Sequence, residues 1–369
     1  MSTRKCPSCG GDMKRNGTTS GGRQRWRCKA CGRSAVFRID NSAKRLDEFL
    51  GWLLGRGRMA DMPGGGRTFR RRTAEFWALW PVAPLAAEPR EFLHVDGIRI
   101  GEGVHVLIAF SGEHVLGWHL ARSESTRAYR GLLSRVAAPA VVVTDGGVGF
   151  PSARREEWPG TEVQRCLVHV FRQVERLTTK RPRLDAGREL RELMFLLMGV
   201  TTVPEARRWE GLFGEWCARW EGFLAEESEG GGAKHRRLAR ARDSLARLVR
   251  QGTLFTYLGR GREGGAAAPS TNNPIEGGVN ARLRAMLRDH RGMSLERRAK
   301  AVFWWCYMHS PDPLPAAELL RTMPTDDDVA AAYLAMGGQE RMTGTIPGWG
   351  DAAVWARLHP EETGHKKWD

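Results

Sequence analysis

Two pairs of cysteines near the start of the chain place the strongest constraint on its fold. Cys6-Pro-Ser-Cys9 and Cys28-Lys-Ala-Cys31 are separated by 18 residues. Two Cys-x2-Cys knuckles at this separation can bring four thiolates onto one Zn²⁺ with tetrahedral geometry. A segment this short has little apolar core, so the metal would supply much of its folding free energy. We therefore predict a zinc ribbon over residues 1–40; unpaired cysteines in a basic tail are the alternative.

Positive charge is concentrated in the same part of the chain. The 369 residues carry a net charge of +16, and residues 1–90 hold 19 basic against 7 acidic side chains, or +12 of that total. A concentrated cationic segment favours a polyanion, and above all nucleic acid, as partner. Arg25, Trp26 and Arg27 combine cations with an aromatic ring, which suits phosphate contact and base stacking. A ribbon that serves only as a structural staple or a protein contact is the alternative.

The apolar residues are too dispersed for a membrane protein. No apolar run reaches the roughly 18 residues needed to span a bilayer, and residues 1–6 lack the apolar stretch of a signal peptide. An odd count of seven cysteines argues against a disulfide framework and for metal ligands or buried thiols. We expect a soluble intracellular protein with no membrane partner.

Residues 41–82 show the pattern of a small helical domain. Apolar residues at positions 46, 49, 50, 53 and 54 share one helical face, and Gly55 and Gly57 end that helix. A short apolar piece and a Pro-Gly-Gly-Gly turn lead to a second helix, which begins with Arg70, Arg71 and Arg72 in its first turns. This layout predicts a helix-turn-helix domain whose arginines contact DNA. An ordinary three-helix domain with a solvated basic face is the alternative.

From residue 91 the pattern changes to strands. Segments 92–100, 104–110 and 115–120 are β-rich and separated by short turns, and an amphipathic helix (126–136) and a buried strand (140–143) follow. Three meandering strands, a helix and a buried strand open a ribonuclease-H-like α/β fold, in which the first and fourth strands are parallel neighbours. Asp96 is on the first of these strands and Asp145 ends the fourth, so we expect the two carboxylates side by side at one edge of the sheet.

Such a pair of carboxylates needs a cation and a third acid to form a reactive site. Oxygen ligands suit Mg²⁺, and two such ions can activate a nucleophile and stabilise the leaving oxygen of a phosphodiester. Glu276 is the candidate third acid, with Asn273 and Asn280 on the same predicted helix and Arg282 and Arg284 beyond it. The alternative role for Glu276 is the carboxylate of a capping box with Asn273 as N-cap.

A long helical stretch separates Asp145 from Glu276. A fifth strand is predicted at 161–166, and residues 185–260 are almost wholly helical in pattern. Trp209, Phe213, Trp216 and Trp220 form a stripe at helical spacing. Core packing is the favoured interpretation of this stripe, and stacking against a displaced base is the alternative.

Taken in order, these motifs resemble those of the Mutator-type (MULE-like) transposases of bacterial insertion sequences, which belong to the DDE polynucleotidyl transferase superfamily. The resemblance extends over residues 6–309 and includes a Cys-x2-His motif, Cys166 to His169. Members of the family insert an all-helical segment between the second Asp and the Glu. The resemblance therefore implies a catalytic domain at 90–309 with an insertion at about 184–268, and we assign no role to residues 310–369.

The resemblance implies that Asp96, Asp145 and Glu276 bind catalytic Mg²⁺ or Mn²⁺. It places Cys166 and His169 beside the site; for His169, contact with phosphate or a site residue and a packed position at a helix start both remain open. The implied activity is cleavage at the element ends and transfer of the freed 3′-hydroxyl to target DNA. The implied partners are terminal inverted repeats, target DNA and further copies of the chain, in the nucleoid of a bacterial cytoplasm. A DNA-binding regulator with an inert domain is the alternative.

Overall fold

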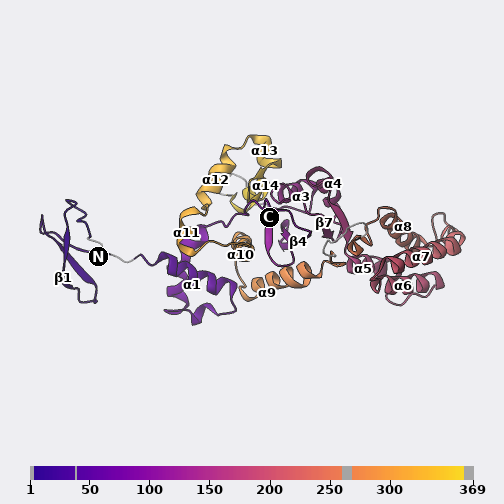
Figure 1. The fold of residues 1–369 in the computed structure, drawn as a ribbon, viewed down its shortest axis with the longest axis horizontal. Coiled ribbons are helices and arrows are strands. Elements are labelled where there is room, and N and C mark those ends of the chain that lie inside the picture. Colours follow the sequence, from indigo (N-terminus) through magenta and orange to yellow (C-terminus); the bar gives the residue numbers. More distant parts are fainter. Residues whose placement is uncertain (1–3, 38–39, 260–267, 361–369) are drawn as a thin grey trace.

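The computed structural model describes residues 4–37, 40–259 and 268–360. The ends of two predicted segments, 260–267 of the insertion and 361–369 of the C-terminal tail, lie outside this range. Figure 1 shows an extended molecule, with a small sheet at one end, a helical bundle at the other and a large mixed sheet between them. None of the helices in the described part of the chain is long and apolar enough to cross a membrane.

A three-stranded antiparallel sheet forms the first unit. Its strands are β1 (Met13–Thr18), β2 (Gln24–Cys28) and β3 (Ser34–Val36). The core of this unit is very small, with Cys6, Met13 and Cys28 buried and Trp26 packed beside them. So little apolar burial cannot offset the ordering of more than thirty residues, at about 1–2 kcal/mol each.

Two helices separated by a turn follow. The helices are α1 (Ser42–Leu54) and α2 (Gly65–Thr73). A 3-10 turn, η1 (Met59–Asp61), lies between them, and a second one, η2 (Ala74–Ala78), follows α2. Helix α1 ends at Gly55, as the sequence predicts. The second helix differs from the prediction: it starts at Gly65, so that Arg70, Arg71 and Arg72 lie in its last turn, and it leaves α-helical geometry after Thr73. Buried Trp52 of α1 packs on Phe69 of α2, and buried Phe49 of α1 packs on Phe76 of η2.

A seven-stranded mixed sheet forms the centre of the molecule, in the order β8-β7-β4-β5-β6-β10-β9. The protein is therefore of mixed α/β class, as predicted. The strands are β4 (Phe92–Gly101), β5 (Val104–Phe110), β6 (Val115–Ala121), β7 (Val141–Thr144), β8 (Glu162–Arg165), β9 (Thr345–Ile346) and β10 (Gly350–Asp351). The expected parallel pairing of β4 with β7 is confirmed, with Val95 opposite Thr144.

Helices cover both faces of this sheet. Helices α3 (Thr126–Leu133) and α4 (Phe150–Glu157) bury one face around Leu93, Val95 and Val142. The other face, around Ile98 and Ile108, packs against η4 (Pro274–Asn280), α9 (Ala281–Asp289) and α10 (Leu295–Met308). Alternate residues along β4 therefore point to two different cores.

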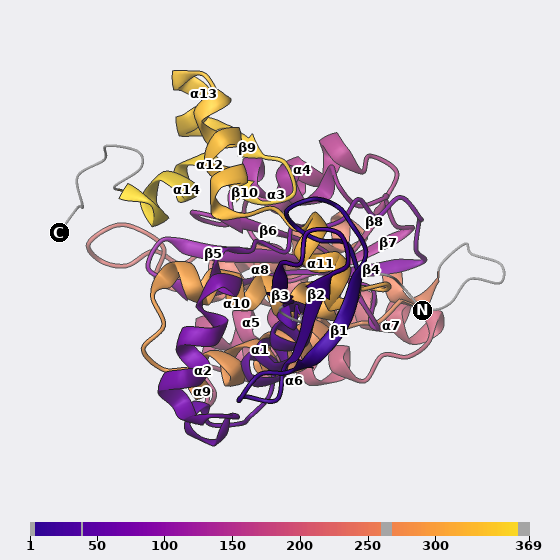
Figure 2. The ribbon, with the colours of Figure 1, turned by 90° about the vertical axis from the view of Figure 1, so that its left-hand side faces the viewer.

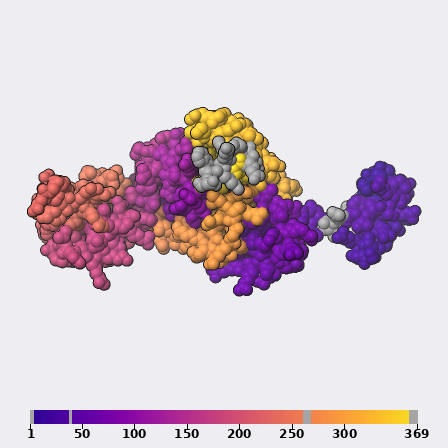
Figure 3. Space-filling view, turned by 180° about the vertical axis from the view of Figure 1, so that it is seen from behind, coloured from indigo at the N-terminus to yellow at the C-terminus, as the bar shows by residue number. Residues whose placement is uncertain are grey.

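The predicted helical stretch after β8 forms a bundle that projects from the body (Figure 3). It consists of α5 (Leu167–Thr178), α6 (Asp185–Met198), α7 (Val203–Leu224), α8 (Arg236–Arg250) and the turn η3 (Thr256–Leu258). Trp209, Phe213 and Trp216 are buried between α7 and α6, and the indole N–H groups of Trp209 and Trp216 donate to backbone carbonyls of α6. The core-packing interpretation of the aromatic stripe is confirmed.

The residues after 310 complete the central unit. Helices α12 (Asp326–Ala335), α13 (Gly338–Thr343) and α14 (Ala352–Leu358) gather around β9 and β10, whereas α11 (Ala316–Thr322) packs against α1. Strand β10 pairs parallel with β6 at Gly350 and Leu120, so this segment extends the sheet by two strands beyond β6. Figure 2 shows α12–α14 gathered on the β6 side of the sheet.

Candidate functional site

The four N-terminal cysteines converge as the sequence predicts. One sulfur from each of Cys6, Cys9, Cys28 and Cys31 lies within 4.8 Å of the others. The Sγ atoms of Cys6 and Cys31 are 3.7 Å apart, and those of Cys9 and Cys28 are 3.5 Å apart. Backbone amides, led by that of Ser8, lower the pKa of Cys6 to about 6. The Gly11 amide also acts on Cys9, but the thiols of Cys31 and Cys28 outweigh it and raise the pKa of Cys9 to about 12. The four-sulfur donor set is consistent with a zinc ribbon, since a bound cation would allow all four thiols to ionise.

The register of the central sheet brings Asp96 and Asp145 together. Strand β4 pairs with β7 up to Val95 and Thr144, and the two aspartates are the next residue on each strand. Asp96 Oδ1 accepts a hydrogen bond from the Gly97 amide at 2.9 Å, and Asp145 Oδ1 accepts one from the Gly147 amide at 3.0 Å. The carboxylates are therefore fixed at adjacent positions on parallel strands.

Asp96 is buried and in a strongly negative environment. Burial, and then the charges of Asp145, Glu276 and Glu124, raise the pKa of Asp96 to about 7, despite the opposing hydrogen bond from the Gly97 amide. Within the described residues, no ion pair involves Asp96 or Asp145. The main hydrogen-bond partner of Asp96 is Asn280, whose Nδ2 donates to Oδ2 at 2.8 Å. The Oδ1 of Asn280 is buried and has no hydrogen-bond partner.

Glu276 lies on η4, a π-helix, which is a rare form that often occurs at functional sites. The capping-box alternative is wrong, because Asn273 has helical backbone angles and makes no side-chain cap hydrogen bond. The Glu276 carboxylate instead faces α5: Oε1 lies 3.0 Å from His169 Nδ1, without hydrogen-bond alignment, and Oε2 lies 3.5 Å from Arg172. Glu276 is close enough to Asp96 to raise its pKa.

The predicted neighbours Cys166 and His169 do lie beside Glu276. One ligand atom from each of these three residues falls within 4.8 Å of the others, whereas Asp96, Asp145 and Glu276 do not form such a compact group in the described chain. The alternative for His169, a histidine packed at the start of a helix, does not fit the structure, because its side chain is 28% exposed and faces the Glu276 carboxylate. Cys166 is buried, which raises the pKa of its thiol.

Asn272 is a site residue that the sequence analysis missed. Asn273, which we predicted, is exposed, and its neighbour Asn272 is fully buried. The Oδ1 of Asn272 accepts from His94 Nδ1 at 2.9 Å. Asn272 also donates through Nδ2 to the Val95 carbonyl and through its backbone N–H to Cys166 Sγ at 3.1 Å. It therefore joins β4, the start of α5 and η4. The Asn-Asn-Pro sequence was the available signal, but it does not say which asparagine points inward.

Glu124 was also missed. It follows β6 and precedes the N-cap of α3, Ser125, where the sequence shows only a polar turn. A Cβ added to Gly97 would lie 2.4 Å from Glu124 Oε1, and one added to Gly147 would lie 3.2 Å from Oε2. Burial, and then Asp145, raise the pKa of Glu124. A further carboxylate, besides that of Glu276, thus lies beside the two aspartates.

Another acidic group, Glu296 with Asp326 and His359, is already paired with a buried lysine. The ammonium of the fully buried Lys300 donates to Glu296 Oε1 at 2.6 Å and to Asp326 Oδ1 at 2.6 Å. Asp326 also accepts from the indole N–H of Trp80 at 2.7 Å. This network joins α10 to α12 and to the chain after η2, and it is structural.

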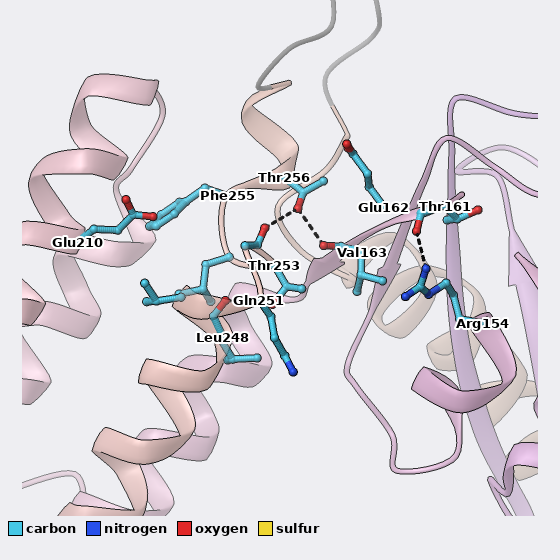
Figure 4. Close-up of a pocket in the computed structure, with 13 residues that line it drawn as sticks. Arg154, Thr161, Glu162, Val163, Glu210, Leu248, Gln251, Thr253, Phe255 and Thr256 are labelled. Carbon is cyan, nitrogen blue, oxygen red and sulfur yellow. Dashed lines mark hydrogen bonds between the residues drawn. The ribbon is translucent and has the colours of Figure 1, made fainter. Parts of the chain in front are cut away.

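A cavity of about 340 Å³ lies between β8 and the helical bundle (Figure 4). Its lining includes Arg154, Glu162 and Glu210 but none of the clustered carboxylates around Asp96. Thr256 Oγ1 donates to the Val163 carbonyl at 2.8 Å across its wall. This hydrogen bond holds the edge of the sheet against the bundle, so we interpret the cavity as a gap left where the two units pack together.

The predicted DNA-contacting residues differ in their surroundings. On β2, Arg25 and Arg27 are exposed, whereas Trp26 lies on the opposite face beneath the guanidinium of Arg4. On α2, Arg70 and Arg71 are exposed and in no recorded ion pair, but Arg72 is paired with Glu48 of α1. The last two predicted residues, Arg282 and Arg284 of α9, are both exposed.

Fold and site together define an α/β protein with a carboxylate cluster at the ends of adjacent parallel strands. Residues 95–221 match the family model described as the Mutator family of transposases. This segment is therefore similar to the transposase domain of the Mutator family, and the predicted resemblance is confirmed over residues 95–221. The match includes Asp96, Asp145, Cys166 and His169 and ends before Glu276. No curated protein matches the chain.

Proposed function

We propose that the protein is the transposase of an insertion sequence, which cleaves DNA at the element ends and transfers the strands to a target. The observation that carries this proposal is the placement of Asp96 and Asp145 at adjacent positions on parallel strands within the segment that matches the Mutator family. In this proposal the core is a ribonuclease-H-like domain. The strand order β6-β5-β4-β7-β8 supports it.

The residues present fit the divalent cations that such chemistry uses. Asp96, Asp145 and Glu276 offer the oxygen ligands that Mg²⁺ or Mn²⁺ prefers, and the unpartnered Asn280 Oδ1 beside Asp96 is a further oxygen without a donor. When bound, the cations would activate the attacking hydroxyl and stabilise the leaving oxygen. The chain itself orients the carboxylates, through the Gly97, Gly147 and Asn280 hydrogen bonds.

Three groups of residues take the other steps in this proposal. The zinc ribbon and a helix-turn-helix formed by α1 and α2 hold the element ends, through exposed arginines on β2 and α2. Arg282 and Arg284 of α9, which directly follows η4, contact phosphates next to the carboxylates. His169 and Arg172 orient Glu276. Synapsis of two ends would need further copies of the chain, and the cell compartment would be the bacterial nucleoid.

Glu276→Gln tests the proposal, because Gln keeps the shape and hydrogen bonding of Glu but loses the charge. We expect the variant to fold and to bind end DNA like the wild type, and to lose strand cleavage and joining in Mg²⁺ by orders of magnitude. Asp145→Asn should behave alike, and the double variant should lose little more, since the ligands act as one unit. Glu113→Gln, in an exposed turn, is the charge-matched control. Cleavage by Glu276→Gln within a few-fold of the wild type would refute its assignment.

The alternative is a DNA-binding regulator with an inert core. End binding without any cleavage by the wild-type chain, in Mg²⁺ and in Mn²⁺ and with a pre-nicked end substrate, would favour it.

A further inference from the structure

Glu124 occupies a pocket that two glycines leave open. Gly97 follows Asp96 directly, and Gly147 lies two residues after Asp145. A Cβ at either position would touch the Glu124 carboxylate, at 2.4 Å from Oε1 and 3.2 Å from Oε2. The same added atom on Gly147 would be 3.8 Å from Asp145 Oδ1. An oxygen of Glu124 and an oxygen of Asp145 therefore lie within 4 Å of one point.

Two carboxylates approach the aspartates from opposite faces of the sheet. Glu276 is carried by η4, which packs on the face around Ile98. Glu124 precedes α3, which packs on the face around Val95. The backbone of residues 124–126 is held close to the Asp145 loop, since a Cβ on Gly149 would lie 2.4 Å from the Ser125 carbonyl carbon.

Within the described part of the chain, Glu124 forms no ion pair with an Arg or Lys, and the one nearby charge that lowers its pKa, that of His105, does not outweigh burial and Asp145. Its recorded hydrogen bond is the donation from Tyr129 Oη to Oε2, at 3.3 Å. By contrast, Glu48, Glu75 and Glu296 each form an ion pair with Arg or Lys. A half-buried carboxylate beside Asp145 and Asp96, with no Arg or Lys bound to it, is electrostatically unfavourable.

An unpartnered oxygen beside Asp96 is an independent feature that points to a ligand at the same cluster. Asn280 is 1% exposed, and its Nδ2 donates to Asp96, yet its Oδ1 has no donor. A buried amide oxygen without a partner is energetically unfavourable. A metal ion or its bound water beside Asp96 would satisfy this oxygen.

We propose that Glu124 is a fourth carboxylate of the site and helps Asp145 to hold a divalent cation, from the face of the sheet opposite Glu276. This inference rests on the proposed function, because it concerns the same cation site. It extends the ligand set beyond Asp96, Asp145 and Glu276. It also gives Gly97 and Gly147 a role, since a side chain at either position would displace Glu124.

Mn²⁺ binding to the zinc-loaded full chain tests the proposal without DNA cleavage. The loss of the free Mn²⁺ signal in electron paramagnetic resonance gives the affinity. We expect Glu124→Gln to weaken Mn²⁺ binding by roughly tenfold or more, because a charged oxygen ligand is lost. Tyr129→Phe removes the phenol that binds Glu124 and keeps the carboxylate, so it should stay within about threefold of the wild type. Glu113→Gln is the control for a lost surface charge and should not change the affinity.

The outcomes separate this inference from the proposed function. Wild-type affinity in Glu124→Gln, with loss in Asp145→Asn, overturns the role of Glu124 and leaves the proposed function intact. Wild-type affinity in Asp145→Asn and Asp96→Asn contradicts the proposed function itself. Equal losses in Tyr129→Phe and Glu124→Gln would make Glu124 a structural partner of Tyr129 and overturn the proposal.

A second measurement uses the wild-type chain and so does not depend on the folding of a variant. Fe²⁺ can replace Mg²⁺ at oxygen-rich sites, and with ascorbate and peroxide it generates radicals that cut the nearby backbone. We expect cuts near Glu124 as well as near Asp96 and Asp145, all suppressed by excess Mg²⁺. Cuts near the two aspartates alone would overturn the proposal.

Discussion

Asp96→Asn should stabilise the protein in the absence of catalytic cations, although it abolishes the proposed activity. Asp96 is 9% exposed, and its surroundings raise its pKa from 3.8 to about 7. A tenfold change in a proton equilibrium is worth roughly 1.4 kcal/mol, so a pKa of about 7 in place of 3.8 means that the buried charge costs the folded state about 4 kcal/mol at pH 8. Asn carries no charge and therefore avoids that cost.

Part of this gain is offset by hydrogen bonding. The Gly97 amide can still donate to the side-chain oxygen of the substituted residue, but Asn280 Nδ2 would face an NH₂ group unless one of the two amides turns. If Asn280 turns, its orphaned Oδ1 gains a donor. We allow about 1 kcal/mol for this rearrangement, which leaves about 3 kcal/mol. At roughly 2 °C per kcal/mol for a chain of this size, the Tm should rise by about 6 °C.

The pH dependence checks the cause. The folded-state pKa of Asp96 lies above its unfolded value, so the wild type loses stability as the pH rises from about 4 to about 7, and Asp96→Asn does not. The difference in Tm should therefore be largest at pH 8 and nearly vanish at pH 4. Saturating Mg²⁺ should raise the Tm of the wild type alone.

Thermal unfolding of zinc-loaded protein at pH 4, 6 and 8, with and without Mg²⁺, measures these differences. Asp47→Asn is a control, since this exposed carboxylate lies on α1, away from the cluster. An unchanged or lower Tm for Asp96→Asn at pH 8 would refute the argument that Asp96 is a desolvated, uncompensated charge.

Three further predictions concern other parts of the molecule. The full chain should hold one zinc ion in the N-terminal unit, and the Cys28→Ser variant should lose this ion and unfold residues 4–37 alone. Metal analysis and amide hydrogen exchange would measure this, and full protection of the unit in a strong chelator would contradict the zinc assignment. The double variant Arg70→Ala with Arg71→Ala should bind terminal repeats more weakly and with a weaker salt dependence. Arg72→Ala should instead mainly lower the Tm, because it breaks the ion pair with Glu48 that joins α1 and α2. Fluorescence anisotropy at several salt concentrations measures the binding, and equal binding defects in the two variants would show that the exposed pair has no special role. Lys300→Met should destabilise the protein by about 3–5 kcal/mol, because Glu296 and Asp326 lose the lysine that pairs with both of them. An unchanged midpoint of urea unfolding would rule this out.

The sequence predicted those features that depend on short-range spacing. The two Cys-x2-Cys knuckles each close a local turn, so four sulfurs were expected to converge wherever that unit lies. The alternation of residues in 92–100 and the apolar run at 140–143 define strands, and a parallel pairing of these strands leaves little freedom in where Asp96 and Asp145 meet. The stripe from Trp209 to Trp216 packs as helical periodicity requires.

Tertiary structure alone decided which polar groups meet. The partners of Glu276, His169 and Arg172, lie over 100 residues away in the sequence, and a capping box fitted the local pattern equally well. Glu124 stands in a polar turn that gives no sign of the two glycines around its carboxylate. Strand β10 adds to β6 across more than 200 residues. Local patterns fix the backbone of an element and its buried face, but contacts between distant elements depend on how the faces pack, which a single chain's periodicity does not encode.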